Sequence, residues 1–372
     1  MVFDMGFSCG IVGLPNVGKS TIFNALTTAR VPAENYPFCT IDPNRGVVPV
    51  PDPRLAHLAE VIHPGKTTPT LLEFIDIAGL VRDAHKGEGL GNQFLEHIRR
   101  VDAVAHVVRK FVEPDVAHLG QGAEPEPRRD IEIVETELLL ADLAVVERRI
   151  EKVSKEAKSG NKEKIKEKKL LESLRELLAK GQPAGRFPRP DFTEEDRAIY
   201  QDLNLITGKP GMYVLNLGEE DLEKEGPAVE AVKRVLPAGA EVVPVFGKIE
   251  SEVSQLAESE REDFLKEMGI RESGLERMIK TGYQILNLVT FYTTVGPELR
   301  AWTVPRGTKA PQAAGKIHTD IERGFIRAEV VTYADFNALG SLHVVRDAGK
   351  FRVEGRDYEI ADGDIVYFRF NV

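Results

Sequence analysis

The chain contains little cysteine and little tryptophan, and it has no long apolar run. Its 372 residues include 2 Cys and 1 Trp, so a disulfide framework is excluded and we expect a reducing, cytoplasmic setting. No apolar stretch approaches the ~18–20 residues that a membrane-spanning helix needs. The first residues lack a basic region followed by an apolar one, so no signal peptide is expected. These absences predict a protein without a membrane partner.

Charge is distributed unevenly along the chain, which has a net charge of −10. Residues 148–180 contain 12 Lys or Arg and 6 Asp or Glu, residues 287–372 contain 11 of each kind, and the rest of the chain is therefore acidic. A basic segment on an acidic body indicates a polyanionic partner such as RNA. A solvated helical face without a partner is the alternative.

Residues 13–20 read Gly-Leu-Pro-Asn-Val-Gly-Lys-Ser, which fits the phosphate-binding loop pattern G-x-x-x-x-G-K-[ST]. In this loop the glycines allow successive backbone N–H groups to point at phosphate oxygens. Lys19 would contact the β- and γ-phosphates, and Ser20 would offer its hydroxyl to Mg²⁺. A short apolar run precedes the motif and a helical pattern follows it. The sequence therefore predicts a nucleotide-binding loop.

Two further segments fit the same kind of site. Asp76-Ile-Ala-Gly79 ends a predicted strand about 55 residues after the loop, where an Asp holds Mg²⁺ and the Gly can donate its N–H to the γ-phosphate. Thr40 lies between the two motifs, and its hydroxyl would complete the Mg²⁺ coordination; a turn-stabilising Thr is the alternative. The metal ligands predicted are Ser20, Thr40 and Asp76.

The segment that would read the base departs from the guanine-specific pattern. Asn216-Leu217-Gly218-Glu219 stands where a GTPase carries Asn-Lys-x-Asp. A carboxylate set to accept hydrogen bonds from guanine would face the N1 acceptor of adenine and be left unpaired, which is costly when buried. Asn216 could instead read the N6/N7 edge, as amides read adenine elsewhere. We expect ATP to be preferred, with a GTP site of relaxed specificity as the alternative.

The residue that follows the Asp76–Gly79 segment also differs from the one expected in a GTPase. A GTPase often has a Gln there that orients the attacking water, but this chain has Leu80. Another group must then orient the water, or turnover is slow. The candidates are His118, which follows the predicted strand 103–108, and the earlier His85 and Glu88; a surface histidine is the alternative for His118.

The pattern of apolar residues divides the chain into four stretches. Residues 1–127 alternate predicted strands (9–13, 71–76 and 103–108) with helices, which is typical of a parallel α/β sheet. Residues 128–202 form a helical insertion, and residues 203–286 return to the first sheet with strands at 212–216 and 241–246. Residues 287–372 form a small mixed α+β domain with predicted strands at 299–304, 324–331 and 364–370.

The insertion has its own pattern. Apolar residues at alternating 4- and 3-residue steps, broken at 159–161, predict two long helices that form a hairpin with a coiled-coil-like seam. We expect the seam to pack within the hairpin rather than drive dimerisation, and hence a monomer. The seam of the first helix is formed by Leu139, Leu143, Val146, Ile150, Val153 and Ala157.

These motifs resemble the YchF/Obg-like ATPase family of phosphate-loop proteins. The resemblance covers essentially the whole chain. Beside the motifs above it rests on further segments: Asn35-Tyr-Pro-Phe-Cys-Thr-Ile-Asp42, Gly87-Glu-Gly-Leu-Gly-Asn92, Ala301-Trp-Thr303, Gly315-Lys-Ile-His-Thr-Asp320 and Phe368-Arg-Phe-Asn-Val372.

The resemblance implies a Ras-like P-loop nucleotide-binding domain, an inserted helical coiled-coil hairpin and a C-terminal TGS domain with a β-grasp fold. It implies ATP hydrolysis in preference to GTP, the ribosome and its RNA as partners, Mg²⁺ as cofactor, and K⁺ held near Asn16. It also implies that His118 orients the water. The nucleotide-binding residues that we expect are Asn16, Val17, Gly18, Lys19, Ser20, Thr21, Gly79, Asn216, Leu217, Glu219, Gly247 and Lys248.

The chain departs from the family pattern in two places. Phe246-Gly247-Lys248 stands where the fifth element usually reads Ser/Cys-Ala-Lys/Ala, so a side-chain hydroxyl contact is lost while backbone contacts can survive. Asp83-Ala84 replaces the usual Gly-Ala, which reduces the local backbone freedom.

Overall fold

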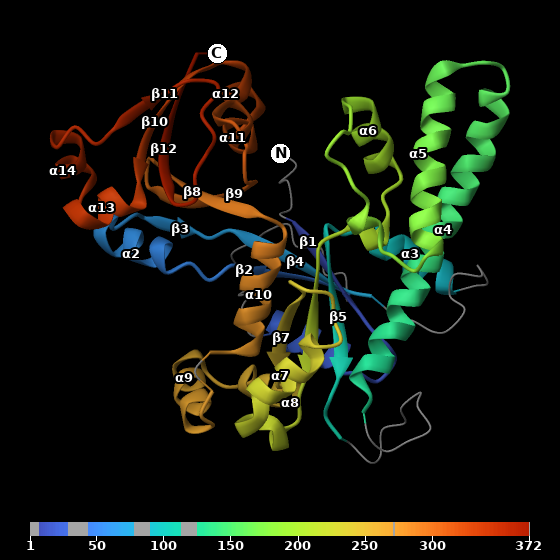
Figure 1. Cartoon of the computed structure of the whole chain (residues 1–372). Helices are drawn as coiled ribbons and strands as arrows, with labels where there is room; N and C mark the ends of the chain where they lie inside the picture. Colours follow the sequence, from blue (N-terminus) through green and yellow to red (C-terminus); the bar gives the residue numbers. More distant parts are fainter. Residues whose placement is uncertain (1–6, 29–43, 78–89, 113–124, 271, 372) are drawn as a thin grey trace.

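The computed structural model describes residues 7–28, 44–77, 90–112, 125–270 and 272–371. Two β-sheets organise these residues, and a pair of long helices projects beside them (Figure 1). The α/β fold with an inserted helical hairpin and a C-terminal mixed α/β unit, expected from the sequence, is confirmed. Boundaries at the single-residue level between the four expected stretches stay predictions.

The first sheet carries the phosphate-binding loop. Its strand order is β2-β4-β1-β5-β6-β7, with β2 antiparallel to β4 and the other pairs parallel. The strands that return after the hairpin therefore extend the sheet begun by the first part of the chain, as expected. The bounds are β1 (Ser8–Val12), β2 (Arg45–Pro49), β4 (Leu71–Asp76), β5 (Ala103–Arg109), β6 (Gly211–Asn216) and β7 (Glu241–Val245).

Helices cover both faces of this sheet, and alternate residues of β6 show how. Met212 and Val214 join a core that includes α10 (Gly274–Ile285), whereas Leu215 joins a cluster that includes α7 (Glu225–Lys233). Strands covered on both faces are mostly apolar, and β1 and β5 are buried along their whole length. The other helices around the sheet are α1 (Lys19–Thr28), α3 (Leu90–Arg100), α8 (Gly247–Val253) and α9 (Glu258–Glu267).

The insertion is a helical arm formed by α4 (Pro127–Ala157), α5 (Lys162–Ala179) and α6 (Glu194–Asp202). Helix α5 begins after the break predicted at 159–161, where the Asn161 side chain accepts hydrogen bonds from the N–H groups of Glu163 and Lys164. The predicted seam is confirmed as internal packing of the hairpin, since Val146 and Val153 of α4 are buried with Leu171 of α5.

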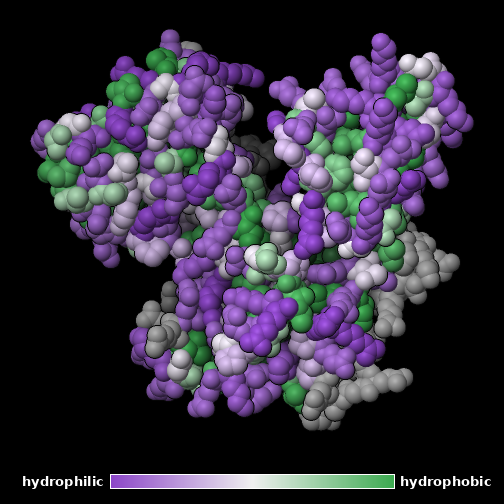
Figure 2. All heavy atoms as spheres, viewed as in Figure 1, coloured by the Kyte–Doolittle hydropathy of each residue, from purple (hydrophilic) through white to green (hydrophobic). Residues whose placement is uncertain are grey.

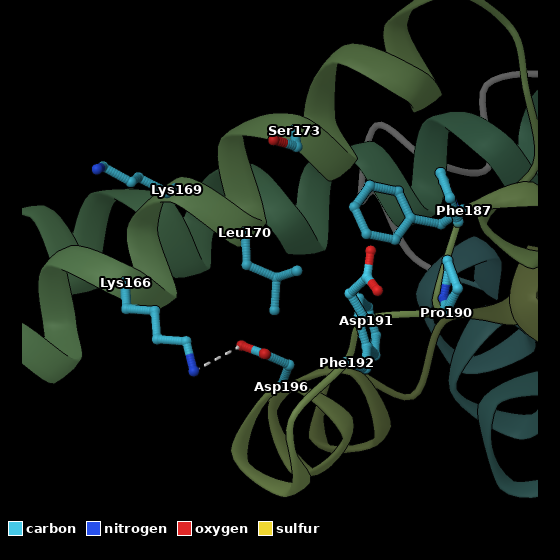
Figure 3. A pocket seen from close by; sticks show the side chains of 10 residues that line it. Lys166, Lys169, Leu170, Ser173, Phe187, Pro190, Asp191, Phe192 and Asp196 are labelled. Carbon is cyan, nitrogen blue, oxygen red and sulfur yellow. Dashed lines mark ion pairs between the residues drawn. The ribbon is translucent and has the colours of Figure 1, made fainter.

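A cavity of about 370 Å³ lies on the arm between α5 and the segment that leads into α6 (Figure 3). Aromatic rings form part of its wall, and a lysine of the wall, Lys166, is already paired with Asp196 at 3.4 Å. The lining residues are Lys166, Lys169, Leu170, Ser173, Phe187, Pro188, Pro190, Asp191, Phe192 and Asp196.

The second sheet has the strand order β11-β10-β12-β8-β9-β3. It is mixed: β12 pairs in parallel with β8 and β3 with β9, while the other pairs are antiparallel. The strands predicted at 299–304, 324–331 and 364–370 are confirmed as β9, β10 and β12. The bounds are β3 (Lys66–Thr68), β8 (Leu288–Val295), β9 (Glu298–Pro305), β10 (Phe325–Thr332), β11 (Arg352–Glu354) and β12 (Asp364–Phe370).

Each face of the second sheet has its own core. Val330 packs with residues of α11, whereas the next residue, Val331, packs with residues of α2 and α13. Helices from distant parts of the chain thus meet on one face. The helices of this unit are α2 (Pro53–Ile62), α11 (Ala310–Ile317), α12 (Thr319–Arg323), α13 (Tyr333–Leu339) and α14 (Leu342–Asp347).

The sequence did not predict that residues 52–68 cross into this second sheet. They lie in sequence between β2 and β4, both strands of the first sheet, yet α2 packs on the second sheet and β3 pairs with β9 (Figure 1). Polar contacts fix the crossing: the Tyr292 hydroxyl donates to Asp52 at 2.5 Å, and Arg54 pairs with Asp362 at 2.7 Å. Residues 52–68 are called the crossing segment below.

In the space-filling view, the arm and the C-terminal unit rise from a common body with an open notch between them (Figure 2). Hydrophilic residues dominate the visible surface of both projections. Across the described residues, no helix is both long and apolar enough to span a bilayer.

Candidate nucleotide-binding site

The phosphate-binding loop connects β1 to α1 at the carboxyl edge of the first sheet. Gly13 and Gly18 have φ angles of 152° and 93°, a region that disfavours residues with a Cβ. A Cβ at Gly13 would also lie 2.5 Å from the carbonyl oxygen of Val107. The loop passes too close to β5 for any other residue, so the spacing seen in the sequence reflects a backbone requirement. Asn16, within the loop, also has a positive φ of 62°.

The side chain of Lys19 crosses the loop that precedes it. Its ammonium donates to the carbonyl oxygens of Leu14 at 2.7 Å and Gly13 at 3.2 Å, and the residue is 7% exposed. Burial lowers the pKa of Lys19 to about 8, while the nearby charge of Asp76 opposes that shift. The group is thus mainly protonated at neutral pH, in a poorly solvated place where attraction to a phosphate is strong.

Ser20 and Asp76 are adjacent, as predicted. The Ser20 hydroxyl donates to Oδ2 of Asp76 at 2.9 Å. Oδ1 of Asp76 is buried and has no hydrogen-bond partner among the described residues, and burial raises the pKa of this carboxyl. A hydroxyl beside a carboxylate with an unused acceptor suits a hard divalent cation such as Mg²⁺. The described residues contain no cluster of three or more His, Cys, Asp or Glu that could hold a metal without phosphate or water ligands.

Asn216, at the end of β6, holds the loop in place. Its amide nitrogen donates to the carbonyl oxygen of Val17 at 3.0 Å, and its amide oxygen accepts from the N–H of Gly247 at 3.1 Å. This amide was expected from the sequence to read the base, and its role in bracing the loop was not predicted. One amide N–H is left for a nucleotide. A Cβ at Gly18 would lie 2.2 Å from the amide nitrogen.

The other residues predicted to read the base lie in two environments. The Leu217 side chain is 3% exposed and packs in the cluster that contains Leu215 and Phe246, so any nucleotide contact would come from its backbone. Glu219 instead forms an ion pair with Lys248 at 3.0 Å, with both side chains largely exposed. Gly247 and Lys248 begin α8, and Thr21 lies exposed in the first turn of α1.

Sequence reasoning missed Arg109 and Phe111, which follow directly from β5. The N–H of Phe111 donates to the carbonyl oxygen of Asn216 at 3.2 Å, and the Arg109 guanidinium lies over the Phe111 ring, 4.4 Å from its centroid. The ring edge is 3.8 Å from the place a Cβ would take on Gly18. An aromatic residue just after a buried strand was the available signal, because ligands bind at this edge of such sheets.

Several predicted residues lie outside the described ranges. These are Thr40, Gly79 and His118, together with Leu80, His85 and Glu88. Their roles in metal binding, phosphate binding and orientation of water stay predictions.

His106 on β5 is a buried histidine whose Nε2 has no hydrogen-bond partner among the described residues. Burial, with a contribution from the charge of Lys19, lowers its pKa to about 3, well below the ~6.5 of an unfolded chain. Below pH 6.5 the unfolded chain gains a proton on this histidine while the folded chain does not, so the free energy of unfolding falls as the pH drops from 6.5 towards 3. Above pH 6.5 the histidine is neutral in both states and the stability is fully present.

We expect this histidine to cost the protein about 1.4 kcal/mol of unfolding free energy on acidification from pH 7.5 to 5.5. In urea unfolding at both pH values, His106→Phe should lose less stability on acidification than the unsubstituted chain. Other groups titrate equally in both proteins, so their contributions cancel in the comparison. If both proteins lost the same unfolding free energy between pH 7.5 and 5.5, His106 would not have the lowered pKa described here.

Comparison with known proteins places these features in a family. Residues 8–139 match the MMR_HSR1 family model, described as "50S ribosome-binding GTPase", and residues 288–371 match YchF-GTPase_C, described as a protein of unknown function. The chain is 49% identical to "Ribosome-binding ATPase YchF" of Escherichia coli O157:H7 over 369 residues, covering 99% of this chain and 100% of that protein.

Two further comparisons agree. The protein of the same name from Bacillus subtilis strain 168 is 49% identical over 371 residues, with 99% and 100% of the two chains covered. The solved structure of the Schizosaccharomyces pombe YchF GTPase superposes with a TM-score of 0.84 at 36% identity, covering 98% of this chain and 97% of that one. The resemblance inferred from the motifs is confirmed, and the chain belongs to the YchF family.

Proposed function

We propose that this chain is a ribosome-binding nucleoside triphosphatase that prefers ATP and uses Mg²⁺. The observation that carries the proposal is the convergence of Lys19, Ser20 and Asp76 at the loop between β1 and α1. The names of the relatives support the same activity.

The residues of the site suit phosphoryl transfer, in which positioning and charge neutralisation supply most of the catalysis. Backbone N–H groups of the loop and the Lys19 ammonium would bind the β- and γ-phosphates. Ser20 and Asp76, with Thr40, would hold Mg²⁺, which supplies charge neutralisation between those phosphates. Leu80 cannot orient a water, so His118 is proposed for that role. Without an activating partner we expect turnover on the order of 10⁻⁴ to 10⁻² per second.

The base-reading region supports ATP as the preferred nucleotide. Guanine recognition in this fold needs a carboxylate facing the base, but Glu219 is engaged with Lys248. The stem of a Lys that would cover the base is replaced by the buried Leu217. Phe111 supplies an apolar ring near the loop instead. An apolar surface with a single amide N–H from Asn216 suits adenine better than guanine, whose donors would go unmet.

We expect ATP to bind at least tenfold more tightly than GTP, a difference of roughly 1.4 kcal/mol. Calorimetric titration of the nucleotide-free protein with each nucleotide, in the presence of Mg²⁺, measures this directly. Equal or tighter binding of GTP would overturn the adenine preference and leave a GTPase with a divergent base motif.

Repeating the ATP titration with K⁺ replaced by Na⁺, with hydrolysis measured in parallel, tests the proposed K⁺ near Asn16.

The arm supports the ribosome as partner. It carries exposed cations on both long helices, among them Lys152, Lys155 and Lys169, and RNA phosphates attract such side chains. Binding that weakens as salt concentration rises would implicate these charges. We also propose that the protein acts as a monomer, because the apolar seam of the arm packs within the hairpin. The proposed place of action is the cytoplasm.

A second candidate function is a constitutive ribosome- or RNA-binding module in which the nucleotide is structural. The basic arm favours it, since its charge does not depend on the nucleotide site. The two candidates differ in whether partner binding follows the nucleotide state, and exchange of Lys19 separates them.

A further inference from the structure

Asp142 lies where the arm meets the first sheet. It is 0% exposed, and its carboxylate accepts hydrogen bonds from four groups. The N–H groups of Ile206 and Thr207 donate at 3.0 and 2.7 Å, and the Thr207 hydroxyl donates at 2.8 Å. The fourth donor is the guanidinium of Arg99, at 3.1 Å. A buried carboxylate satisfied from so many sides is held rigidly and tolerates little displacement.

Helix α4 changes partners at this residue. On its N-terminal side, Val134, Leu138 and Ala141 belong to the core of the first sheet. On its C-terminal side, Val146 and Val153 belong to the core of the arm. The helix is continuous and runs on for 15 residues from Asp142 to its end at Ala157, about 22 Å at 1.5 Å per residue. A small rotation of α4 at Asp142 is therefore a large displacement at the tip of the arm.

Arg99 brings a third element to this point. It lies on α3, which runs beside the middle of α4 (Figure 1), and the residue makes further contacts there. Its guanidinium donates to the carbonyl oxygens of Asn204 at 3.0 Å and Ala141 at 3.2 Å, and its own carbonyl oxygen accepts from the Asn204 amide at 2.7 Å. Arg99 thus ties α3 both to α4 and to the segment that returns from the arm.

Among the described elements, α3 follows β4, the strand that ends at the proposed metal ligand Asp76. Thirteen residues of sequence separate Asp76, at the end of β4, from Leu90, where α3 begins. Phe94 and Ile98 of α3 are buried in the same core as Val134 and Leu138 of α4. A shift of α3 would therefore reach α4 through this shared core and through Arg99.

We propose that Arg99 and Asp142 form the joint through which the nucleotide site sets the angle of the arm. The joint includes the return segment 204–207, so that α3, α4 and the end of the insertion move together. The inference rests on the proposed function, because it requires that ATP and ADP are bound with different arrangements of α3. Regulation of ribosome binding would then depend on an ion pair formed by residues outside the phosphate-binding loop and outside the tip of the arm.

The test measures the arm directly. Spin labels on non-natural amino acids at Ser159, at the tip, and Ala238, on the body, report the tip-to-body distance by pulsed dipolar spectroscopy with Mg²⁺–ADP and with a non-hydrolysable ATP analogue. In the unsubstituted chain we expect two different mean distances. Arg99→Met should abolish that difference while changing ATP affinity by less than about twofold.

Matched variants exclude a general loss of structure. Arg149→Met removes an arginine whose partners, Glu167 and Asp202, both lie within the arm, so it should keep the full difference. Arg99→Lys keeps a charge but cannot reach Asp142, Asn204 and Ala141 together, and it should reduce the difference if Arg99→Met does not fold.

Three outcomes would overturn the joint. If the distance between the labels at Ser159 and Ala238 were the same with ADP and with the ATP analogue in the unsubstituted chain, the joint would be excluded. ATP hydrolysis and ribosome binding would still stand as the proposed function. The joint would also be excluded if both Arg99 variants kept the tip-to-body distance change between the two nucleotide states. Failure of the chain to bind or hydrolyse ATP would overturn the proposed function and the joint with it.

Discussion

Lys19→Met is expected to lower the rate of ATP hydrolysis on the order of 10²- to 10³-fold, the usual effect of removing one preorganised cationic or hydrogen-bonding group from a transition state. The ammonium is held at the loop by the carbonyl oxygens of Gly13 and Leu14, so it needs little reorganisation to meet the phosphates. Methionine keeps the length of the stem, so the fold should tolerate the change.

Phosphate release under single-turnover conditions measures this effect. Lys309→Met is the matched control, because that side chain is exposed and pairs with Asp357 at 2.7 Å in the unit of the second sheet; it should hydrolyse ATP at nearly the unsubstituted rate. A Lys19→Met protein within threefold of the normal rate would exclude this loop as the catalytic centre. The same variant separates the two candidate functions, since a switch would lose nucleotide-dependent ribosome binding and a constitutive binder would keep it.

Asn216→Asp is expected to weaken nucleotide binding by roughly 10- to 100-fold, if one buried hydrogen bond is lost and an acceptor is left unpaired. The two side chains have nearly the same shape. However, the carboxylate would place an oxygen where the amide now donates to the Val17 carbonyl, and two acceptors would then face each other in a buried place. The loop would lose the brace that fixes its position relative to β6 and Gly247.

Asn287→Asp provides the comparison for this substitution. Asn287 is exposed, and its side-chain oxygen accepts from Arg306 at 3.2 Å, a role that a carboxylate fulfils equally well. Titration of each variant with ATP, together with thermal unfolding in the absence of nucleotide, distinguishes loss of the site from loss of the fold. Unchanged ATP affinity in Asn216→Asp would mean that the loop holds its shape without this brace.

The elements that the sequence predicted well are those set by local pattern. The phosphate-binding loop depends on glycines within eight residues, and the hairpin depends on apolar spacing and on a break at 159–161 that caps α5 through Asn161. β5 is buried along its whole length and mostly apolar, because both of its faces are covered. In each of these cases, the residues that determine the structure are close together in the sequence.

Features that depend on distant partners were missed. Nothing near Asn216 shows that its amide meets Val17, 199 residues earlier. Asp142 reads as one more polar residue of a long helix until Arg99 and Thr207 are brought to it. The crossing segment has an ordinary amphipathic helical pattern. Such a pattern shows which face of the helix is buried, but it does not show which of the two sheets that face packs against. Pairings of this kind are fixed by the tertiary fold and not by local propensity.

The crossing segment has a consequence for how the protein is made. Leu55 and Leu58 of α2 pack against Tyr292 and Leu299, residues that are synthesised more than 220 positions later. At 5–20 residues per second, the early apolar face waits roughly 12–50 s for its partner strands. The second sheet therefore completes only after β12 has been synthesised, and a chain truncated before β8 would keep this face exposed to water and to other nascent chains.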